Sequence, residues 1–185
     1  MIRVFDVFIS ILTLLIFLPI MFIISLLILA IDGRPIIYKQ SRVGYKGRLF
    51  IIFKFRTMSN VIFKDEKLRL LPLGRILRRS SLDELPQLIN VLKKDMSIVG
   101  PRPLPKIIEK KISRSMRTKR RQILPGITGM SQINFSGKKR KLIEKIRLDI
   151  EFINNYTLYN YFKILLKTPI VLIIRFFKSK SSIIK

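Results

Sequence analysis

Asp83 and Glu84 are adjacent carboxylates in a strongly basic sequence, and they are the residues best suited to chemistry. They lie in the segment SSLDELPQLINVLKK, residues 80–94, which has the pattern of a helix start. Acidic groups among arginines beside a free helix N-terminus predict a phosphate site, with a carboxylate available for a metal ion or for attack. The alternative is that both carboxylates only cap the helix and balance its dipole. The basic neighbours favour the phosphate site: Arg75, Arg78, Arg79, Lys93, Lys94 and Arg102.

The local pattern allows two registers for the start of this helix. Ser81 with Glu84 fits a capping box, but Pro86 then occupies a position where a helical N–H is needed. Asp83 as the N-cap instead places Pro86 in the unpaired first turn. Both registers put the carboxylates at the head of the helix. The helical spacing of its apolar residues predicts a buried stripe: Leu85, Leu88, Ile89 and Leu92.

The composition limits the chemistry and the partners. The chain has 185 residues, a formal net charge of +26, no cysteine and no histidine. Thiolate metal sites, imidazole bases and Ser-His-Asp triads are therefore excluded, and chemistry falls to carboxylates, lysines and tyrosines. The positive charge predicts a polyanionic partner, which is nucleic acid, an anionic membrane surface or a phosphorylated small molecule. The length fits one modest domain plus an unusually apolar segment.

An uncharged segment near the N-terminus has the length of a membrane helix. Val7 to Ile31 form 25 positions without a charge. The segment is too long for the apolar part of a signal peptide and lacks a convincing cleavage site, so we expect it to be retained. Pro19 divides it into two arms of 12 residues. Each arm is about 18 Å of helix, or about half the hydrocarbon thickness.

Two topologies are open for this segment, and Pro19 predicts a kink in both. A re-entrant hairpin fits the half-length arms. A kinked helix that spans the bilayer is the interpretation that the residues alone favour, because neighbouring groups can satisfy the freed carbonyls. A spanning helix would carry Arg3 across the membrane, whereas a re-entrant helix keeps both ends on the cytoplasmic face. Both topologies leave the basic body in the cytoplasm.

The segment 36–58 predicts a β-hairpin. It is rich in β-branched and aromatic residues, and two glycines in its middle indicate a tight turn. Lys54 and Arg56 are two residues apart on the second strand, so they project from one face while phenylalanines take the other. The hairpin therefore has a cationic face, which either binds an anion or is simply solvated.

Three segments resemble the bacterial sugar transferase family, the monotopic phosphoglycosyl transferases. They are QSRVGYKGRLFIIFKFRTM (40–58), GRILRRSSLDELPQLINVLKKDMSIVGPRPL (74–104) and LPGITGMSQIN (124–134), and the likeness runs from Phe5 and Asp6 to about Asn154. The resemblance implies transfer of a sugar 1-phosphate from a UDP-sugar to polyprenyl (undecaprenyl) phosphate, with release of UMP. This reaction is the first membrane step in making bacterial surface glycans such as lipopolysaccharide, capsule, exopolysaccharide or glycoprotein.

The resemblance also implies residue roles. Asp83 would attack the sugar-linked phosphorus to give a covalent aspartyl-phosphosugar, and Glu84, with Asp83, would bind Mg²⁺. Lys54, Arg78 and Arg102 would surround the phosphates. Asp149 aligns with an acidic residue on which the family relies, although its context also fits an ordinary helical salt bridge. The full set of expected phosphate- and substrate-binding residues is Lys54, Arg56, Arg78, Pro101, Arg102, Pro103, Gln132 and Asp149.

The expected fold is of the α+β class. The resemblance favours the re-entrant topology, so that residues 1–31 form a membrane-inserted helix broken at Pro19. Residues 32–185 then form a small cytoplasmic catalytic domain, with the short hairpin and interfacial amphipathic helices towards the C-terminus. The expected location is the bacterial cytoplasmic membrane with its anionic lipids, with the catalytic domain on the cytoplasmic face. A homodimer remains open, and no nucleic acid partner is expected.

The sequence departs from the family pattern at several positions. Leu18 replaces a common serine at the helix break, and Lys94 replaces a glycine. Met130 and Ser131 replace a tryptophan and an alanine, and residues 135 and 136 replace a frequent Gly-Arg, so nucleotide or sugar contacts are expected to differ there. Two rival functions also stay open. The chain could be a catalytically silent membrane-anchored scaffold of this family, or a basic polyanion-binding protein.

Overall fold

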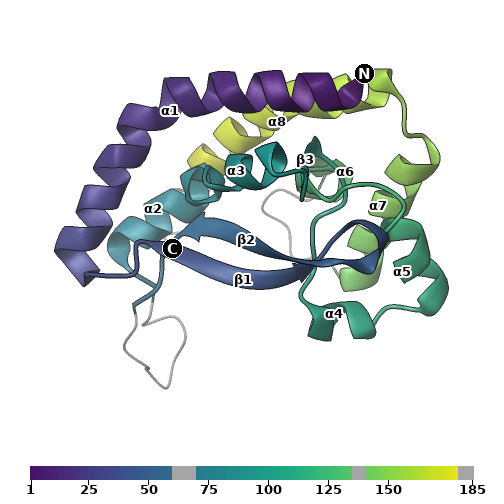
Figure 1. Ribbon diagram of the computed structural model, residues 1–185, viewed down its shortest axis with the longest axis horizontal. Coiled ribbons are helices and arrows are strands. Elements are labelled where there is room, and N and C mark those ends of the chain that lie inside the picture. Colours follow the sequence, from purple (N-terminus) through teal and green to yellow (C-terminus); the bar gives the residue numbers. More distant parts are fainter. Residues whose placement is uncertain (60–69, 135–140, 179–185) are drawn as a thin grey trace.

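The first helix, α1, runs from Ile2 to Asp32 and contains Pro19. The computed structural model describes residues 1–59, 70–134 and 141–178. In it α1 bends about midway, so that its two arms run in different directions (Figure 1). Proline removes a helix hydrogen bond and crowds the preceding turn, which accounts for the bend. The predicted kink is therefore present.

Most of the apolar surface of α1 is not covered by the rest of the described chain. Within that part of the chain, α1 is the one helix with the length and composition to cross a membrane. Its most apolar stretch has a mean hydropathy of 3.1, and only 11% of that stretch is buried. Ile24 and Ile28, on the second arm, do pack against Phe55 and Leu77. An exposed apolar surface of this extent is typical of contact with lipid or with another protein.

Asp6 ties the first arm of α1 to the interior. This carboxylate is 1% exposed. Its Oδ1 accepts hydrogen bonds from the Ser97 hydroxyl at 3.0 Å, the Ile98 backbone N–H at 2.8 Å and the Tyr161 hydroxyl at 2.7 Å. Burial and this hydrogen bond to Asp6 raise the pKa of Tyr161, which therefore stays protonated as a donor. Asp6 thus joins three elements that are far apart in the sequence.

Asp6→Ala is expected to lower the thermal stability, because it leaves three buried donors without an acceptor. A cost of about 2–4 kcal/mol, or a fall in Tm of roughly 5–15 °C, is the usual scale for such a loss. Asp6→Asn keeps an oxygen at the accepting position and should retain most of the Tm. Differential scanning fluorimetry on both variants checks this. Equal Tm values for Asp6→Ala and the parent would contradict the anchoring role.

The predicted hairpin is confirmed. Strands β1 (Ile37–Val43) and β2 (Leu49–Phe55) pair antiparallel, with a 3₁₀ turn at Tyr45–Gly47 between them. Gly47 has a φ of +80°, a conformation that glycine adopts without strain and that explains the glycine signal in this turn. In Figure 1 the hairpin lies on the opposite side of α3 (Gln87–Leu92) from the first arm of α1.

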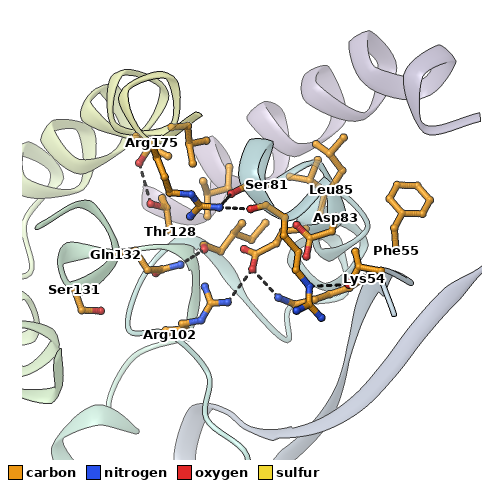
Figure 2. A pocket seen from close by; sticks show the side chains of 18 of the residues that line it. Lys54, Phe55, Ser81, Asp83, Leu85, Arg102, Thr128, Ser131, Gln132 and Arg175 are labelled. Atoms are coloured by element: carbon orange, nitrogen blue, oxygen red, sulfur yellow. Dashed lines mark hydrogen bonds and ion pairs between the residues drawn. The ribbon is translucent and has the colours of Figure 1, made fainter. Parts of the chain in front are cut away.

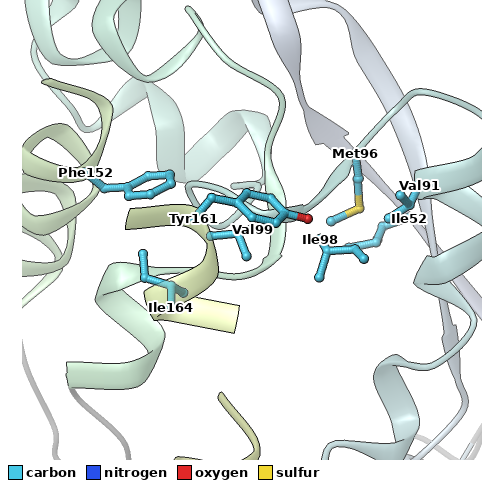
Figure 3. Close-up of a cluster of buried hydrophobic side chains, with 8 residues drawn as sticks. All are labelled: Ile52, Val91, Met96, Ile98, Val99, Phe152, Tyr161 and Ile164. Atoms are coloured by element: carbon cyan, nitrogen blue, oxygen red, sulfur yellow. The ribbon is translucent and has the colours of Figure 1, made fainter. Parts of the chain in front are cut away.

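The main core is built around a second, smaller sheet, whose strand β3 contributes Ile98 and Val99 to it. Strands β3 (Ser97–Val99) and β4 (Gly126–Thr128) pair parallel, a pairing that the sequence did not predict because three-residue strands carry no readable alternation. Figure 3 shows the buried side chains around them. This cluster consists of Ile52, Val91, Met96, Ile98, Val99, Phe152, Tyr161 and Ile164.

The chain between α2 and α3 differs from both predicted helix registers. Helix α2 (Pro72–Ser80) ends at Ser81, which adopts a left-handed conformation with φ 60°, and a 3₁₀ turn at Leu82–Glu84 leads into α3. Neither Ser81 nor Asp83 makes the predicted capping hydrogen bond. The carboxylates do precede a helix, but as part of a tight turn, so capping is not their role. The left-handed backbone of Ser81 separates α2 from this turn.

The predicted buried stripe on α3 is only partly correct. Leu88 and Val91 are buried, but Ile89 is 43% exposed and Leu92 is 36% exposed. Because α3 is apolar on two faces, spacing alone could not tell which face packs inward.

The remaining described helices complete the mixture of helices and small sheets expected for an α+β fold. Helix α8 is a single helix of 21 residues whose first half enters the core through Tyr161 and Ile164, while its later part exposes Ile170, Ile173 and Phe177. The helices that follow β3 are α4 (Lys106–Lys110), α5 (Arg114–Arg120), α6 (Met130–Asn134), α7 (Leu142–Asn154) and α8 (Leu158–Lys178).

Candidate active site

Lys54, Glu84 and Arg102 form an ion-pair cluster at the centre of the molecule. Lys54 Nζ lies 2.6 Å from Glu84 Oε1, and Arg102 Nη2 lies 2.8 Å from the same oxygen. The three side chains come from β2, from the turn before α3 and from the loop after β3, and Figure 2 marks these ion pairs. Within the described residues, Glu84 Oε2 has no hydrogen-bond partner. Glu84 is thus fixed by two cations through one oxygen only.

Asp83 is the carboxylate of the pair that is left without partners. The residue is 8% exposed, it lines the main cavity, and no donor in the described parts of the chain hydrogen-bonds its carboxylate. Burial and the charge of Glu84 raise the pKa of Asp83 to about 6, against the opposing effect of nearby cations. An unbonded, partly desolvated carboxylate has its lone pairs available for attack.

Glu84 has the opposite electrostatic environment. Burial alone would raise the pKa of this carboxyl, but the charges of Arg102 and Lys54 and the hydrogen bonds they donate outweigh it and lower the pKa to about 2. The two adjacent acids therefore differ in role. Glu84 stays ionised between two cations, while the carboxyl of Asp83 has no hydrogen bond from the described residues.

A braced turn presents Asp83. Gly74, in α2, lies so close to residue 57 that a Cβ there would be 2.0 Å from the Thr57 carbonyl oxygen, so α2 packs directly on the end of the hairpin. Arg78 Nε donates to the Thr57 hydroxyl at 2.8 Å. From α8, Arg175 donates to Ser81 Oγ at 3.0 Å and to the Arg78 carbonyl. The turn is held from both sides.

A second brace holds Arg102. The buried Arg120 donates to the Arg102 carbonyl at 2.6 Å and to Asp149 Oδ2 at 3.1 Å. Burial raises the pKa of Asp149, opposed by the charge of Arg120. Asp149 Oδ1 is buried without a partner in the described chain and faces the same cavity. Arg120 therefore links Asp149 to the loop that carries Arg102.

The cavity between these groups has a volume of about 1220 Å³. This exceeds the roughly 300–1,000 Å³ usual for one small-molecule ligand. Its wall combines the ionic cluster with apolar residues of α1 and α8, including Ile9, Leu165 and Leu172. The space therefore suits a charged ligand at one end and an apolar ligand at the other.

Most of the predicted site residues come together here. The cavity is lined by Lys54, Arg56, Arg78, Asp83, Glu84, Arg102, Gln132 and Asp149. Gln132 donates from Nε2 to the Ile127 carbonyl at 2.7 Å, and its Oε1 is buried without a partner among the described groups. The chain thus assembles residues from five separate segments around one space.

Three predicted site residues have contacts that indicate a supporting role. Arg56 is 4% exposed and pairs with Asp32 at 2.9 Å, so it holds the end of α1 to β2. Pro101 and Pro103 are buried and do not line the cavity, and they shape the loop around Arg102. Direct phosphate or substrate binding by these three residues stays a prediction without support from this geometry.

Sequence reasoning missed three arginines of the site. Arg42 lines the cavity from β1, Arg120 braces Arg102, and Arg175 braces the turn before Asp83. Their partners lie far away in the sequence, so no local pattern could reveal them. Arg79, one of the basic neighbours of the carboxylate pair, does not line the cavity and lies over the Phe176 ring at 5.9 Å from its centroid.

Two family departures can be located. Ser131 is 5% exposed and lines the same cavity as Asp149, so a serine here adds a polar group to the cavity wall. Lys94 has a φ of +65°, a left-handed conformation that explains why a glycine is usual at this position. The departures at 135 and 136 lie outside the described residues.

Comparison with known proteins agrees with this class of site. The family described as bacterial sugar transferase matches residues 1–175. The chain is 37% identical over 155 residues to the galactosyl transferase CpsE of Streptococcus agalactiae. This match covers 74% of this chain and 34% of CpsE. It is 37% identical over 198 residues to the undecaprenyl-phosphate galactose phosphotransferase of Salmonella typhimurium. This match covers 94% of this chain and 40% of that protein.

A third relative is matched over a larger share of its own length. The UDP-glucose:undecaprenyl-phosphate glucose-1-phosphate transferase of Caulobacter vibrioides is 35% identical over 181 residues, covering 90% of this chain and 67% of that protein. The chain thus spans between a third and two thirds of these three relatives. A carboxylate turn surrounded by cations beside an exposed apolar helix defines a class of protein with a phosphate-binding type of site. Within that class, the chain belongs to the bacterial sugar transferase family.

Proposed function

We propose that this protein transfers a sugar 1-phosphate from a UDP-sugar to undecaprenyl phosphate through a covalent intermediate on Asp83. The observation that carries the proposal is the contrast within the carboxylate pair. Glu84 is held by Lys54 and Arg102, whereas the Asp83 carboxylate faces the cavity without a hydrogen bond from the described residues. Relatives named for this type of transfer support the substrate class.

In the first step a carboxylate oxygen of Asp83 attacks the phosphorus that carries the sugar. A bond forms between that oxygen and phosphorus, and the bond to the bridging oxygen of the diphosphate breaks. UMP leaves with the electron pair of the broken bond. Lys54, Arg78 and Arg102 line the same cavity and stabilise the charge on the transferring and leaving groups.

In the second step a phosphate oxygen of undecaprenyl phosphate attacks the same phosphorus. The bond between phosphorus and Asp83 breaks, which regenerates the carboxylate and gives undecaprenyl diphosphate sugar. The apolar wall formed by α1 and α8 fits an acceptor whose phosphate must reach the site from lipid. Neither step needs a histidine as general base, and the chain contains no histidine.

The residues present fit a bound Mg²⁺. Magnesium prefers one or two carboxylates together with phosphate oxygens and water. Asp83 and the free Oε2 of Glu84 would hold it, although the described chain contains no group of three or more acidic ligands. When bound, the ion would neutralise charge on the diphosphate oxygens.

Both ends of α1 contact the same body, which supports the re-entrant topology. Arg3 donates to the Val91 and Leu92 carbonyls at the end of α3 and, at 3.2 Å, to the Met96 carbonyl just before β3. At the other end of α1, Asp32 pairs with Arg56. A helix crossing the bilayer would separate its ends by about 30 Å of hydrocarbon. We therefore propose that residues 1–31 enter and leave the membrane on the cytoplasmic face, where residues 32–185 lie.

The proposal is tested by weighing the intact protein after incubation with donors. The full chain in lipid nanodiscs, with Mg²⁺ and a panel of UDP-sugars, should gain the mass of a sugar 1-phosphate and release UMP with at least one donor. Adding undecaprenyl phosphate should restore the original mass. Glu151→Gln, an exposed acid on α7, is the matched control and should still form the adduct.

The same experiment separates the rival functions. UMP release without any adduct would overturn the covalent mechanism. A protein that neither gains mass nor releases UMP with any donor would be the silent scaffold. Duplex binding that is strongly salt-dependent and survives Asp83→Asn, with no UMP release, would identify the polyanion-binding protein. The relatives are named for galactose and for glucose, so the donor panel also decides the sugar.

A further inference from the structure

Three residues of β1 line the cavity and have no part in the transfer chemistry above. Tyr38, Gln40 and Arg42 alternate along β1 and all three line the cavity. Tyr38 pairs directly with Lys54 on β2, so these side chains share the face that carries the ionic cluster. Together they cover about 14 Å of strand, at about 3.4 Å per residue.

Arg42 is a cation without an acidic partner in the described chain. It donates to the side-chain oxygen of Gln40 and to the Pro103 carbonyl at 3.3 Å, and its Nε is buried without a partner. Burial and the nearby charge of Arg102 lower the pKa of Arg42. Two guanidinium groups facing one space repel each other, and a bound phosphate would relieve this repulsion.

The other two residues have the chemistry to recognise a base. Tyr38 is 44% exposed, which leaves its ring available for stacking. Gln40 uses its oxygen to accept from Arg42, so its amide N–H groups are the part left to donate. A pyrimidine base offers a flat face and carbonyl acceptors to such a pair.

The position of this face separates it from the apolar end of the cavity. The hairpin and the first arm of α1 lie on opposite sides of α3 (Figure 1). The apolar wall near Ile9 and Leu165 suits the lipid acceptor, whereas the β1 face is polar and aromatic. The donor's nucleotide is the ligand with a matching base and phosphate.

We propose that Tyr38, Gln40 and Arg42 form the binding site for the nucleoside monophosphate half of the donor, the part that leaves as UMP. Arg42 pairs with the phosphate next to the ribose, Gln40 donates to the base, and Tyr38 stacks on it. The inference rests on the proposed function for the identity of the donor, but the site itself binds the nucleotide without any reaction.

The test measures UMP binding to the full chain in nanodiscs by isothermal titration calorimetry. Arg42→Ala should weaken UMP binding about 10- to 100-fold, the usual scale for a lost charge-assisted contact. Tyr38→Ala, at an exposed position that tolerates truncation, should weaken it several-fold. Arg48→Ala, in the same hairpin but outside the cavity lining, is the control and should bind UMP like the parent.

A second readout separates donor binding from acceptor binding. The phosphosugar adduct, once formed and freed of UMP, should react with undecaprenyl phosphate at the parent rate in Arg42→Ala. A slowed second step would instead assign Arg42 to the acceptor phosphate and overturn the proposal. Unchanged UMP binding in both Arg42→Ala and Tyr38→Ala would also overturn it.

The outcomes distinguish this inference from the proposed function. If the adduct forms on Asp83 but UMP affinity is unchanged in Arg42→Ala and Tyr38→Ala, the inference fails and the proposed function stands. If UMP binds through Arg42 but no donor ever modifies Asp83, the nucleotide site stands and the covalent transfer fails.

Discussion

Asp83→Asn is expected to abolish turnover and, at the same time, to stabilise the fold. On the proposed mechanism this change removes the nucleophile and with it the covalent route, and a fall of about 10⁴-fold or more is usual for such a loss. The stabilisation follows from burial. Asp83 is 8% exposed and has no hydrogen bond in the described chain, so its ionised form is costly in the folded state.

The stabilisation should depend on pH in a defined direction. The pKa of Asp83 is raised from 3.8 to about 6 in the folded protein. The folded state therefore favours the protonated acid, and ionisation of Asp83 destabilises the fold as pH rises through this window. The penalty is absent below pH about 3.8 and complete above pH about 6, where it is on the order of 3 kcal/mol. Asparagine cannot ionise and escapes it.

Thermal denaturation in metal-free buffer at pH 4.5 and pH 7.5 checks this prediction. Asp83→Asn should raise Tm by several degrees at pH 7.5 and by much less at pH 4.5. Glu151→Gln should change neither activity nor Tm. A lower Tm for Asp83→Asn at both pH values would show that the carboxylate supports the fold, contrary to its position as an unbonded nucleophile.

The elements with local signatures were predictable from the sequence. The length and central proline of the first helix predict α1 and its bend, and the alternation and glycines of 36–58 predict the hairpin. Lys54 could be placed on a cationic face because strands have a period of two. Each of these features depends on residues that are close together in the chain.

The features that sequence analysis missed depend on long-range contacts. Ser81 adopts a φ of 60°, and no glycine at this position indicates the left-handed conformation in the sequence. Its hydroxyl accepts a hydrogen bond from Arg175, which is 94 residues away. Arg120 reaches the Arg102 carbonyl across 18 residues. Arginines are numerous in this chain, so their type alone could not indicate which ones brace the site. Packing selected them.

The resemblance to a family supplied what local patterns could not. Asp83 and Glu84 looked equally suited to capping, and the geometry separates them. Glu84 is clamped by Lys54 and Arg102, and Asp83 is not. The difference between two neighbouring carboxylates is set by groups on β2 and on the loop after β3, so it exists only in the folded chain.

Arg102→Ala is expected to have the second largest effect, a fall in kcat/KM of about 10²–10³-fold, the usual scale for removing one preorganised donor to a developing charge. Nη2 of Arg102 pairs with Glu84. The side chain lines the cavity and is 45% exposed, so the other N–H groups of its guanidinium can bind phosphate oxygens. Its backbone is fixed by Arg120, which makes this fork preorganised.

Arg102→Lys separates charge from geometry. A lysine keeps the positive charge near Glu84 but cannot bind two phosphate oxygens with a planar fork, so it should recover only part of the lost rate. Arg114→Ala, at an exposed position in α5 outside the cavity lining, is the control. Steady-state UMP release checks all three variants, and full activity in Arg102→Ala would remove this arginine from the phosphate site.

Because Arg102 also lowers the pKa of Glu84, its loss should leave the pKa of that carboxyl higher, which couples the cation to the acid it holds.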